Sequence, residues 1–353
     1  MNNSTDYPVY EYDDDVTAVL NVGIYINNYY LWAIFAFGFP GNVASVITII
    51  RMQRITTSTY YVAVLAVIDN CAIVFKLLYH QLTLHQVWLD SMGCKVLNFL
   101  SLFFTTFANW ILVFIATERF VAVRKPLKVG MYWTIPRAMF SVGGLTCVVT
   151  IIYCHIFWTF TGNGPYCTID LQYLHFYRDV WYWLNAAVYS LAPCFLLITL
   201  NFFIVQSVRK STIVRNQLSM KNGTKSSNST RSMRQEKQIT VMLVSVAVVF
   251  IILTVPRCIY AIVHLYWNVQ LGTMADAQKY LIDQLTFFLC DSNHAINFYL
   301  YFTTGKKFRR HFLDMVFCRK RRRTHLNVSQ SGTTMTVQTY KLSNLENRHV
   351  KEL

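Results

Sequence analysis

The stretch that decides the fold is CKVLNFLSLFFTTFANWILVFIATER, residues 94–119. Between Val96 and Thr117 it contains no ionised side chain, so this part is suited to a hydrocarbon environment. At a rise of about 1.5 Å per residue, a helix places Cys94 and Arg119 about 37 Å apart, slightly more than the hydrocarbon core of a bilayer. The thiol and the guanidinium group are therefore expected on opposite sides of a membrane.

The composition agrees with a membrane location. Apolar residues make up 54% of the 353 residues, charged residues make up 14%, and the mean hydropathy is positive. A soluble domain of this length would be more polar. The formal charge of +15 is confined to loops between apolar runs, so nucleic acid is not an expected partner.

Seven apolar stretches have about the length that crosses a bilayer. They cover residues 29–50, 60–82, 96–118, 138–160, 182–206, 239–265 and 280–302. Lys and Arg are concentrated after the first, third, fifth and seventh stretches, which predicts that these loops are cytoplasmic and that the amino terminus is outside. We therefore predict an all-α membrane protein, a seven-transmembrane helix bundle over residues 29–303, that is a multi-pass protein of the plasma membrane.

The parts outside the bundle have distinct compositions. Residues 1–28 contain acids and no Lys or Arg, which predicts a disordered extracellular tail, glycosylated at Asn2 and Asn3. Residues 304–318 combine basic residues with Phe and Leu at helical spacing, which predicts a short amphipathic juxtamembrane helix bound to membrane lipid. Cys318 is its palmitoylation candidate, the alternative being an unmodified thiol. Residues 319–353 are predicted to be a disordered cytoplasmic tail, and 210–234 a disordered linker.

Two of the nine cysteines stand apart from the others. Six lie within the apolar stretches, and Cys318 is on the predicted cytoplasmic side. Cys94 and Cys167 remain, both on the predicted outer side, where oxidising conditions permit a disulfide. We expect a bond between them that fastens the loop before the fifth stretch over the bundle.

A series of short motifs resembles the class A, rhodopsin-like G-protein-coupled receptors over residues 29–318. The motifs are Gly41-Asn42, Leu65 to Asp69, Trp88, Cys94 with Cys167, Glu118-Arg119-Phe120, Pro126, Pro193, Phe250 with Pro256, and Asn297 to Tyr301. The resemblance implies activation from outside and coupling to a heterotrimeric G protein. It also implies that a receptor kinase and an arrestin act on the Ser- and Thr-rich tail.

The resemblance assigns roles to residues inside the bundle. Asp69, Asn42, Asn293 and Asn297 would form a polar cluster that holds a sodium ion in the family, although Ala108 stands where a serine ligand usually lies. Arg119 would pair with Glu118 and reach Glu236 until the sixth span swings outward. The residues assigned to activation and G-protein coupling are Asp69, Glu118, Arg119, Glu236, Phe250, Pro256, Asn297 and Tyr301.

Departures from the family pattern narrow the resemblance. Thr254 replaces the tryptophan of the sixth span, and Phe298 replaces the proline of the seventh. The resulting Asn-Phe-aromatic-Leu-Tyr sequence resembles invertebrate neuropeptide receptors of the FMRFamide and myosuppressin types. This resemblance implies a neuropeptide as the ligand.

For two other ligand classes, the chain lacks a residue that their receptors require. Ser101 stands where receptors for biogenic amines carry an aspartate, and Asp291 stands where opsins carry a lysine. Charges of both signs within the membrane indicate either mutual pairing or contact with a large polar ligand. The candidate ligand-binding residues are Lys76, Ser101, Arg257, Tyr260, His264, Asp283 and Asp291.

An extracellular peptide is the predicted ligand. Lys76 and Asp291 either neutralise each other or contact the ligand, and both interpretations stay open. Arg257 has no obvious partner and is the candidate anchor for a ligand carboxylate or amide carbonyl, with a pair to Asp283 or Asp291 as the alternative. The loop 161–179 predicts a β-hairpin lid. A lipid or small chemosensory ligand, or a seven-span channel or transporter, are the alternative functions.

Neither catalysis nor cofactor binding is expected. The chain lacks G-x-S-x-G, H-E-x-x-H, C-x-x-C and a phosphate-binding loop, and its nine histidines lack metal-ligand spacing. The sequence therefore predicts a receptor that is not an enzyme and that contains no catalytic metal.

Overall fold

The computed structural model describes residues 13–52, 55–125, 130–131, 133–162, 167–222 and 227–317, and in 211–240 it describes the backbone alone. Four residues singled out in the sequence, Asn2, Asn3, Pro126 and Cys318, lie outside these ranges. The side chain of Glu236 is also outside the description. The predictions that rest on these residues stay predictions.

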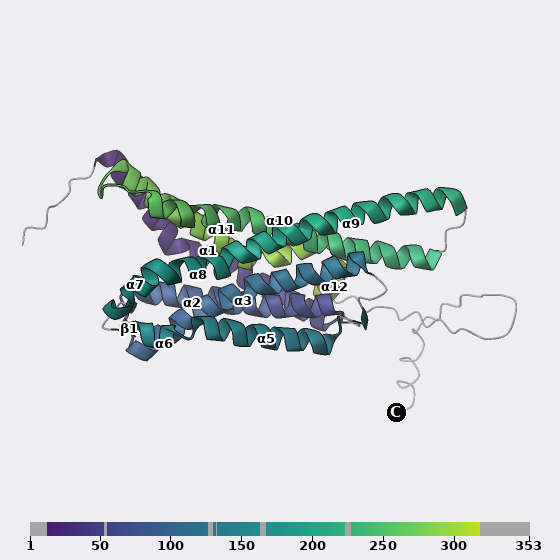
Figure 1. The fold of residues 1–353 in the computed structure, drawn as a ribbon, viewed down its shortest axis with the longest axis horizontal. Coiled ribbons are helices and arrows are strands. Elements are labelled where there is room, and N and C mark those ends of the chain that lie inside the picture. The colour runs from purple at the N-terminus through teal and green to yellow at the C-terminus, as the bar shows by residue number, and fades with distance from the viewer. Residues whose placement is uncertain are drawn as a thin grey trace, which may run out of the picture. The chain divides into compact units, whose positions relative to one another are not determined.

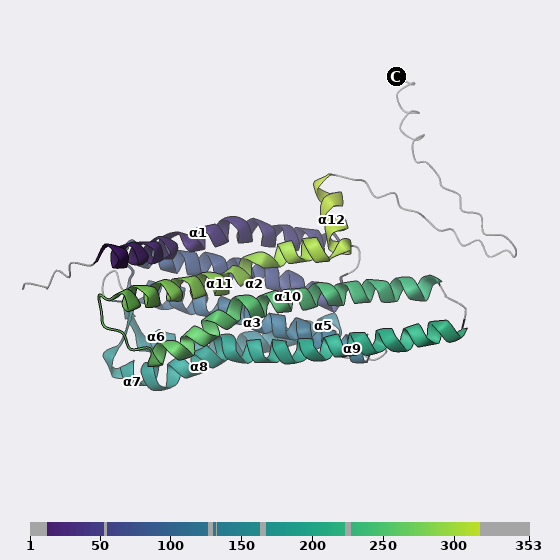
Figure 2. The same ribbon diagram turned by 90° about the horizontal axis from the view of Figure 1, so that it is seen from above.

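Seven long helices form the described part of the bundle and run alongside one another within the unit that ends at Phe312 (Figures 1 and 2). They are α1 Asp14–Ile50, α2 Thr57–Leu84, α3 Ser91–Arg124, α5 Ile135–Tyr153, α9 Ala192–Asn222, α10 Ser227–Tyr266 and α11 Met274–Thr304. Six helical segments are long and apolar enough to cross a membrane, and α11 is the seventh. The predicted all-α seven-transmembrane bundle is confirmed.

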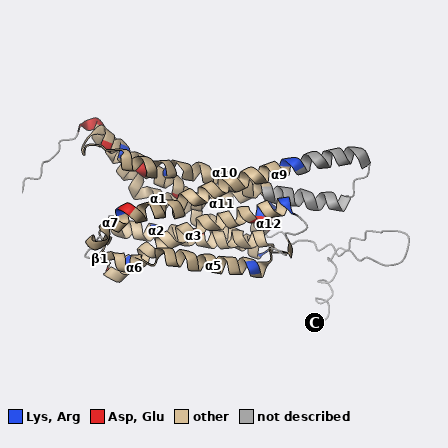
Figure 3. Cartoon of the chain, in the orientation of Figure 1, with Lys and Arg blue, Asp and Glu red and all other residues tan. Residues whose placement is uncertain are grey.

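Charged residues lie mostly toward the two ends of these helices, and the middle is largely uncharged (Figure 3). We call the end with Cys94, near the start of α3, the disulfide end. We call the opposite end, where α3 reaches Arg119 and Arg124, the Arg119 end. Buried apolar residues such as Tyr61, Ile111 and Phe250 form the core between the two ends.

Short elements connect α5 to α9 at the disulfide end. They are α6 Ile156–Thr159, β1 Phe160–Gly162, β2 Cys167–Ile169, the 3-10 helix η1 Leu171–Tyr173, α7 Leu174–Phe176, the π-helix η2 Tyr177–Trp181, α8 Tyr182–Ala186 and the π-helix η3 Ala187–Leu191. The strands β1 and β2 are antiparallel, with Thr161 opposite Thr168. The predicted β-hairpin is confirmed. After α11 in the chain, α12 Lys306–Val316 matches the predicted amphipathic helix.

The start of α1 differs from the prediction. Residues 14–28 are helical, whereas the acidic composition predicted a disordered tail as far as residue 28. Asp14 and Asp15 lie in the first turn, where carboxylates interact favourably with the helix dipole. The ring of Tyr280 on α11 lies against Gly23, so that a Cβ added there would be 2.8 Å from the ring. This part of α1 therefore packs against α11 outside the predicted membrane-spanning stretch.

The segment between α9 and α10 is also more helical than predicted. Residues 210–222 continue α9 and residues 227–234 belong to α10, so the prediction of a disordered linker is wrong for these residues. The sequence from Ser211 to Asn222 contains Arg, Gln, Leu, Met and Lys, which favour helices, and has no Gly or Pro. No helix-breaking residue interrupts this extension of α9.

Side chains of α3 compensate for the proline in α9. Pro193 has no N–H, so it cannot donate to a carbonyl one turn earlier in the chain. Asn109 Nδ2 instead donates to the Tyr189 carbonyl at 2.8 Å, and Trp110 Nε1 donates to the Val188 carbonyl at 3.0 Å. These bonds join α3 to the π-helical turn η3 and set the position of α9 beside α3.

We expect Asn109→Ala to destabilise the bundle by about 1 to 2 kcal/mol, because the Tyr189 carbonyl then lacks a donor within the membrane. Thermal unfolding of the protein purified in detergent measures the loss. In a Pro193→Ala background the cost should be smaller, because residue 193 regains an N–H. Equal costs in the two backgrounds would show that Asn109 does not compensate for the proline.

Candidate ligand-binding and signalling sites

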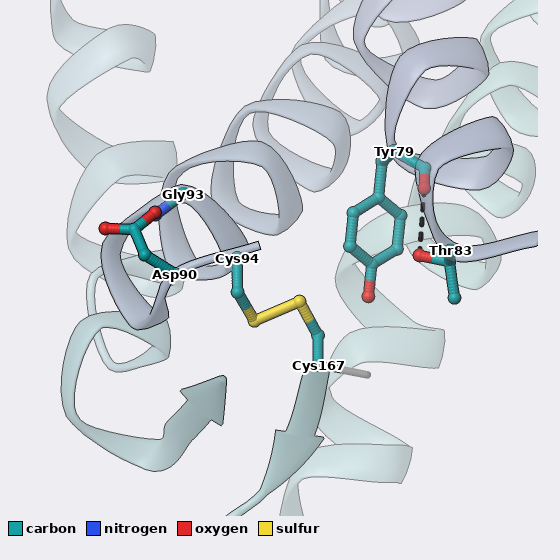
Figure 4. Close-up of a disulfide and its surroundings, with 6 residues drawn as sticks. All are labelled: Tyr79, Thr83, Asp90, Gly93, Cys94 and Cys167. Carbon is teal, nitrogen blue, oxygen red and sulfur yellow. Dashed lines mark hydrogen bonds between the residues drawn. A yellow bond between two sulfur atoms is a disulfide. The ribbon is translucent and has the colours of Figure 1, made fainter. Parts of the chain in front are cut away.

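A disulfide joins α3 to the β-hairpin. Cys94 and Cys167 are bonded, with their Cα atoms 5.6 Å apart, so the predicted bond is confirmed. Asp90 caps α3 by accepting a hydrogen bond from the Gly93 N–H at 2.9 Å, which fixes the turn that carries Cys94. Figure 4 shows Asp90 on one side of the bond and Tyr79 of α2 on the other. The disulfide therefore lies at the edge of α2 and α3.

The first ion pair of the candidate ligand site joins α2 to α11. Lys76 Nζ lies 2.6 Å from Asp291 Oδ1, and the Tyr30 hydroxyl donates to Asp291 Oδ2 at 3.2 Å. The Asp291 side chain is 2% exposed, whereas that of Lys76 is 21% exposed. The ion pair that the sequence offered as one interpretation is present, and contact of these residues with a ligand stays a prediction. Lys76 lies one turn from Tyr79 on α2, on the side of the disulfide end.

The second ion pair joins α10 to α11. Arg257 Nη1 lies 2.6 Å from Asp283 Oδ1 and donates to Thr286 Oγ1 at 3.4 Å. The expectation that Arg257 has no partner is therefore wrong. Asp283 and Thr286 are three residues apart on one face of α11, and this face is turned toward α10. The alternative pair with Asp283 is the one found.

The cations of both ion pairs lie near one aromatic ring. The Arg257 guanidinium carbon lies 3.5 Å from the centre of the Phe287 ring, and Lys76 Nζ lies 5.3 Å from it. Cations near the face of an aromatic ring are stabilised by its quadrupole. Phe287, Arg257, Lys76 and Asp283 are each half-buried, so part of each side chain remains accessible.

The other candidate ligand residues are placed differently. Tyr260 lies 5.3 Å from the Arg257 guanidinium carbon and donates to the Lys279 carbonyl at 3.3 Å. His264 is exposed, with its ring 5.6 Å from that of Tyr260. Ser101 is buried on α3, and within the described ranges no hydrogen bond joins it to the ion pairs. The structure thus brings together Lys76, Asp291, Arg257, Asp283 and Tyr260, and leaves Ser101 apart.

The polar cluster in the middle of the bundle has a member that the sequence did not predict. Asp69 accepts hydrogen bonds from His294 Nδ1 and from Asn297 Nδ2, each at 2.8 Å. Asn42 Nδ2 donates to the His294 carbonyl at 3.0 Å. Asn293 is buried, but no hydrogen bond in the described ranges joins it to Asp69. His294 lies three residues before Asn297, the spacing that places two side chains on one helix face.

The Arg119 end contains a buried charge pair. Arg119 Nη2 lies 3.0 Å from Glu118 Oε1, and Ser58 at the start of α2 donates to the same oxygen at 2.9 Å. Arg119 also contacts the Ser58 hydroxyl. Sequence reasoning missed Ser58, because a serine at a helix start is usually a capping residue. Three further residues assigned to activation lie on other helices. Phe250 of α10 and Tyr301 of α11 are buried in the core, and Pro256 lies inside α10.

A groove opens beside this pair between α3 and α5. It has a volume of about 690 Å³ and is lined by aromatic and basic residues. The lining residues are Phe120, Val121, Arg124, Lys125, Trp133, Arg137, Phe140 and Ser141.

Comparison with known proteins identifies the family. Residues 41–301, more than half of the chain, match the family described as 7 transmembrane receptor (rhodopsin family). The chain belongs to this family. Type-1 angiotensin II receptor B of Xenopus laevis is 23% identical to the receptor over 320 residues, which cover 86% of this chain and 82% of the relative. Sex peptide receptor-related protein 2 of Caenorhabditis elegans is 22% identical over 252 residues, which cover 61% of this chain and 52% of the relative.

Membership explains the arrangement of the receptor. Proteins of the rhodopsin family are multi-pass membrane receptors and not enzymes, which agrees with the apolar helices described above. The class A identification made from the motifs is confirmed. The two groups of interacting charges therefore belong to a receptor, one group toward the disulfide end and one at the Arg119 end.

The disulfide should be required for a stable receptor. It closes a loop with a sequence separation of 73, for which the entropic model gives a stabilisation of about 4 kcal/mol. We expect Cys94→Ala and Cys167→Ala each to abolish surface expression or ligand binding, and the double variant to be no worse than either single variant. Flow cytometry and ligand binding measure both effects. A single variant with wild-type expression and affinity would show that the bond is dispensable.

The Lys76–Asp291 pair should show strong coupling in a double-mutant cycle. Lys76→Met leaves a buried carboxylate without its cation, which should cost about 3 to 5 kcal/mol of stability. Lys76→Met combined with Asp291→Leu removes both charges and should recover most of that loss. Thermal unfolding in detergent provides the cycle, with Tyr30→Phe as a milder control. Additive losses would show that the two residues are not coupled.

Proposed function

We propose that this receptor binds an extracellular neuropeptide and signals through a heterotrimeric G protein. The disulfide end then faces the outside of the plasma membrane and the Arg119 end faces the cytosol. Lys and Arg are concentrated in the loops at the Arg119 end, which supports this orientation. In this orientation the amino terminus would be extracellular, where Asn2 and Asn3 could be glycosylated.

The observation that carries the proposal is that two ion pairs, Lys76–Asp291 and Arg257–Asp283, both have their cation near the ring of Phe287. Arg257 is 20% exposed and Asp283 is 27% exposed, so both signs of charge are available to a ligand. In the described ranges, both hydrogen bonds of Arg257 fall on Nη1, which leaves Nε and Nη2 to hold a ligand oxygen. A peptide supplies both hydrogen-bond acceptors and donors. A small amine would not find the carboxylate it needs, because Ser101 stands at that position.

The relatives support a peptide as the ligand class. One relative is named as a receptor for angiotensin II and another as related to a sex peptide receptor. The Asn297 to Tyr301 sequence supports the finer assignment to receptors of the FMRFamide and myosuppressin types. Phe298 in this sequence packs against Gly41 of α1, where an added Cβ would lie 3.1 Å from its Cβ. The phenylalanine in this sequence is thus accommodated by close packing of α1 on α11.

The Arg119 end supports the signalling part of the proposal. Ser58 and Glu118 hold Arg119 within the bundle, and Glu236 would reach it from α10 in the resting state. The groove with Arg124 and Trp133 offers basic and aromatic contacts to a G protein. The amphipathic helix α12 would lie on the inner membrane surface and be anchored through Cys318. The phosphorylated tail 319–353 would then bind an arrestin.

A peptide screen tests the proposed function. The receptor is expressed in cells with a G-protein reporter and exposed to matched amidated and unamidated neuropeptides, with untransfected cells as the control. We expect a saturable response to a peptide. A response to lipids or small odorants alone would contradict the peptide class, and an ion current without any G-protein response would contradict the receptor mechanism.

Arg257 should hold the carboxyl-terminal end of the peptide. Arg257→Ala should weaken binding by about 2 to 5 kcal/mol if the contact is buried and charge-assisted. Arg257→Lys should recover only part of this loss, because an ammonium group cannot form the bidentate contact of a guanidinium group. Radioligand competition in membranes measures both variants.

Peptide analogues distinguish an anchor from a structural pair. Capping or shortening the carboxyl end should reduce affinity in the wild type and have little further effect in Arg257→Ala. Asp283→Asn is the matched control, because it breaks the ion pair and leaves the guanidinium group in place. If the truncation costs the same affinity in wild type and in Arg257→Ala, Arg257 only ties α10 to α11.

A further inference from the structure

The cluster around Asp69 can be compared with the sodium site that the family resemblance implies. A hard cation is held by oxygen ligands arranged around it, and a carboxylate provides the charge that compensates for lost hydration. Asp69 is the natural candidate for this ligand, since its exposed fraction is 0%. The atoms that surround Asp69 therefore decide whether the residues present fit such an ion.

Both oxygens of Asp69 already face nitrogen donors. His294 Nδ1 lies 2.8 Å from Oδ1, and Asn297 Nδ2 lies 2.8 Å from Oδ2. An ionised carboxylate only accepts hydrogen bonds, so beside an ionised Asp69 the His294 ring carries a hydrogen on Nδ1. The partly positive hydrogens of these two donors point at the oxygens that a cation would approach. Ala108 is buried and, by the family resemblance, stands where a serine ligand usually lies, so its side chain offers no oxygen.

The imidazole of His294 is held in this position by the helices around it. His294 is 3% exposed, and its main-chain carbonyl accepts a hydrogen bond from Asn42 on α1. The next residue, Ala295, lies so close to Gly38 of α1 that an added Cβ on Gly38 would be 2.9 Å from the Ala295 Cα. The ring therefore has a fixed place beside Asp69.

Other buried oxygens in the cluster do not change this outcome. Asn42 Oδ1, Ser45 Oγ, Asn293 Oδ1 and Asn297 Oδ1 have no hydrogen-bond partner in the described ranges. They are uncharged amide and hydroxyl oxygens, and water satisfies such groups in protein interiors. The charged ligand is the carboxylate, which is engaged by His294 and Asn297. The residues present do not fit a sodium ion.

We infer that the His294 side chain takes the place of the sodium ion beside Asp69, so that the stability of this receptor does not depend on sodium. The receptor thus supplies the partner of its buried carboxylate from its own α11. The resting contact between α2 and α11 is made by the protein alone.

The first experiment compares salts on the full-length wild-type receptor purified in detergent. Its thermal unfolding midpoint is measured in NaCl and in choline chloride at equal ionic strength. We expect equal midpoints at all salt concentrations. A rise that is specific to NaCl and saturates with its concentration would overturn the inference. No agonist is used, so the result is independent of the proposed peptide ligand.

The second experiment makes a sodium site by substitution. His294→Ser combined with Ala108→Ser removes the imidazole and adds two hydroxyl oxygens near Asp69. We expect NaCl to raise the unfolding midpoint of this double variant by a few degrees relative to choline chloride, because an ion that binds only the folded state stabilises it. Ala108→Ser alone retains His294 and should remain insensitive to sodium.

A third substitution tests whether the sodium response of the double variant depends on the Asp69 carboxylate. Asp69→Asn added to the double variant should abolish the sodium response, because the charged ligand is lost. A folded double variant that is indifferent to sodium would overturn the claim that the imidazole is what excludes the ion. If the double variant does not fold, the wild-type comparison alone decides, since a sodium-stabilised wild type contradicts the inference.

Discussion

An ionised group within a bilayer is costly unless another group compensates for its charge, and this constraint explains how the helices of the receptor are joined. Asp69, Asp291 and Glu118 are nearly fully buried carboxylates, and each has a hydrogen-bond or ion-pair partner. In every case α2 takes part, through Ser58, Asp69 or Lys76. These three residues are separated by about three and about two helical turns, so they lie on one face of α2. One face of α2 therefore carries a polar contact at each level of the bundle.

The features that could be predicted from the sequence depend on local pattern and on the membrane. Apolar length located the spans, and the position of cysteines relative to the membrane singled out Cys94 and Cys167. Gly162 and the residues after it indicated the hairpin, which the structure contains. Each of these inferences needs only the order of residues along the chain and the thickness of a bilayer.

The contacts that escaped prediction depend on how helices are rotated against each other. Arg257 and Asp283 lie on different helices, and periodicity does not reveal that their side chains meet. His294 was not distinguished from an ordinary core histidine until α2 was placed beside α11. In α1, Gly23 lies against the ring of Tyr280 on α11, a contact that the acidic composition does not reveal. Tertiary packing decided all three, and no single stretch of sequence contains it.

Phe287 has a consequence for communication across the bundle. Its ring lies near cations from α2 and α10, so these helices are linked through one side chain of α11. The two ion pairs therefore do not act as separate units. Moving Arg257 away from the ring changes the surroundings of Lys76, and by thermodynamic reciprocity a change at Lys76 alters the energy of moving Arg257. A single aromatic side chain of α11 thus contacts cations from two neighbouring helices, in addition to the ion pairs that join each of them to α11.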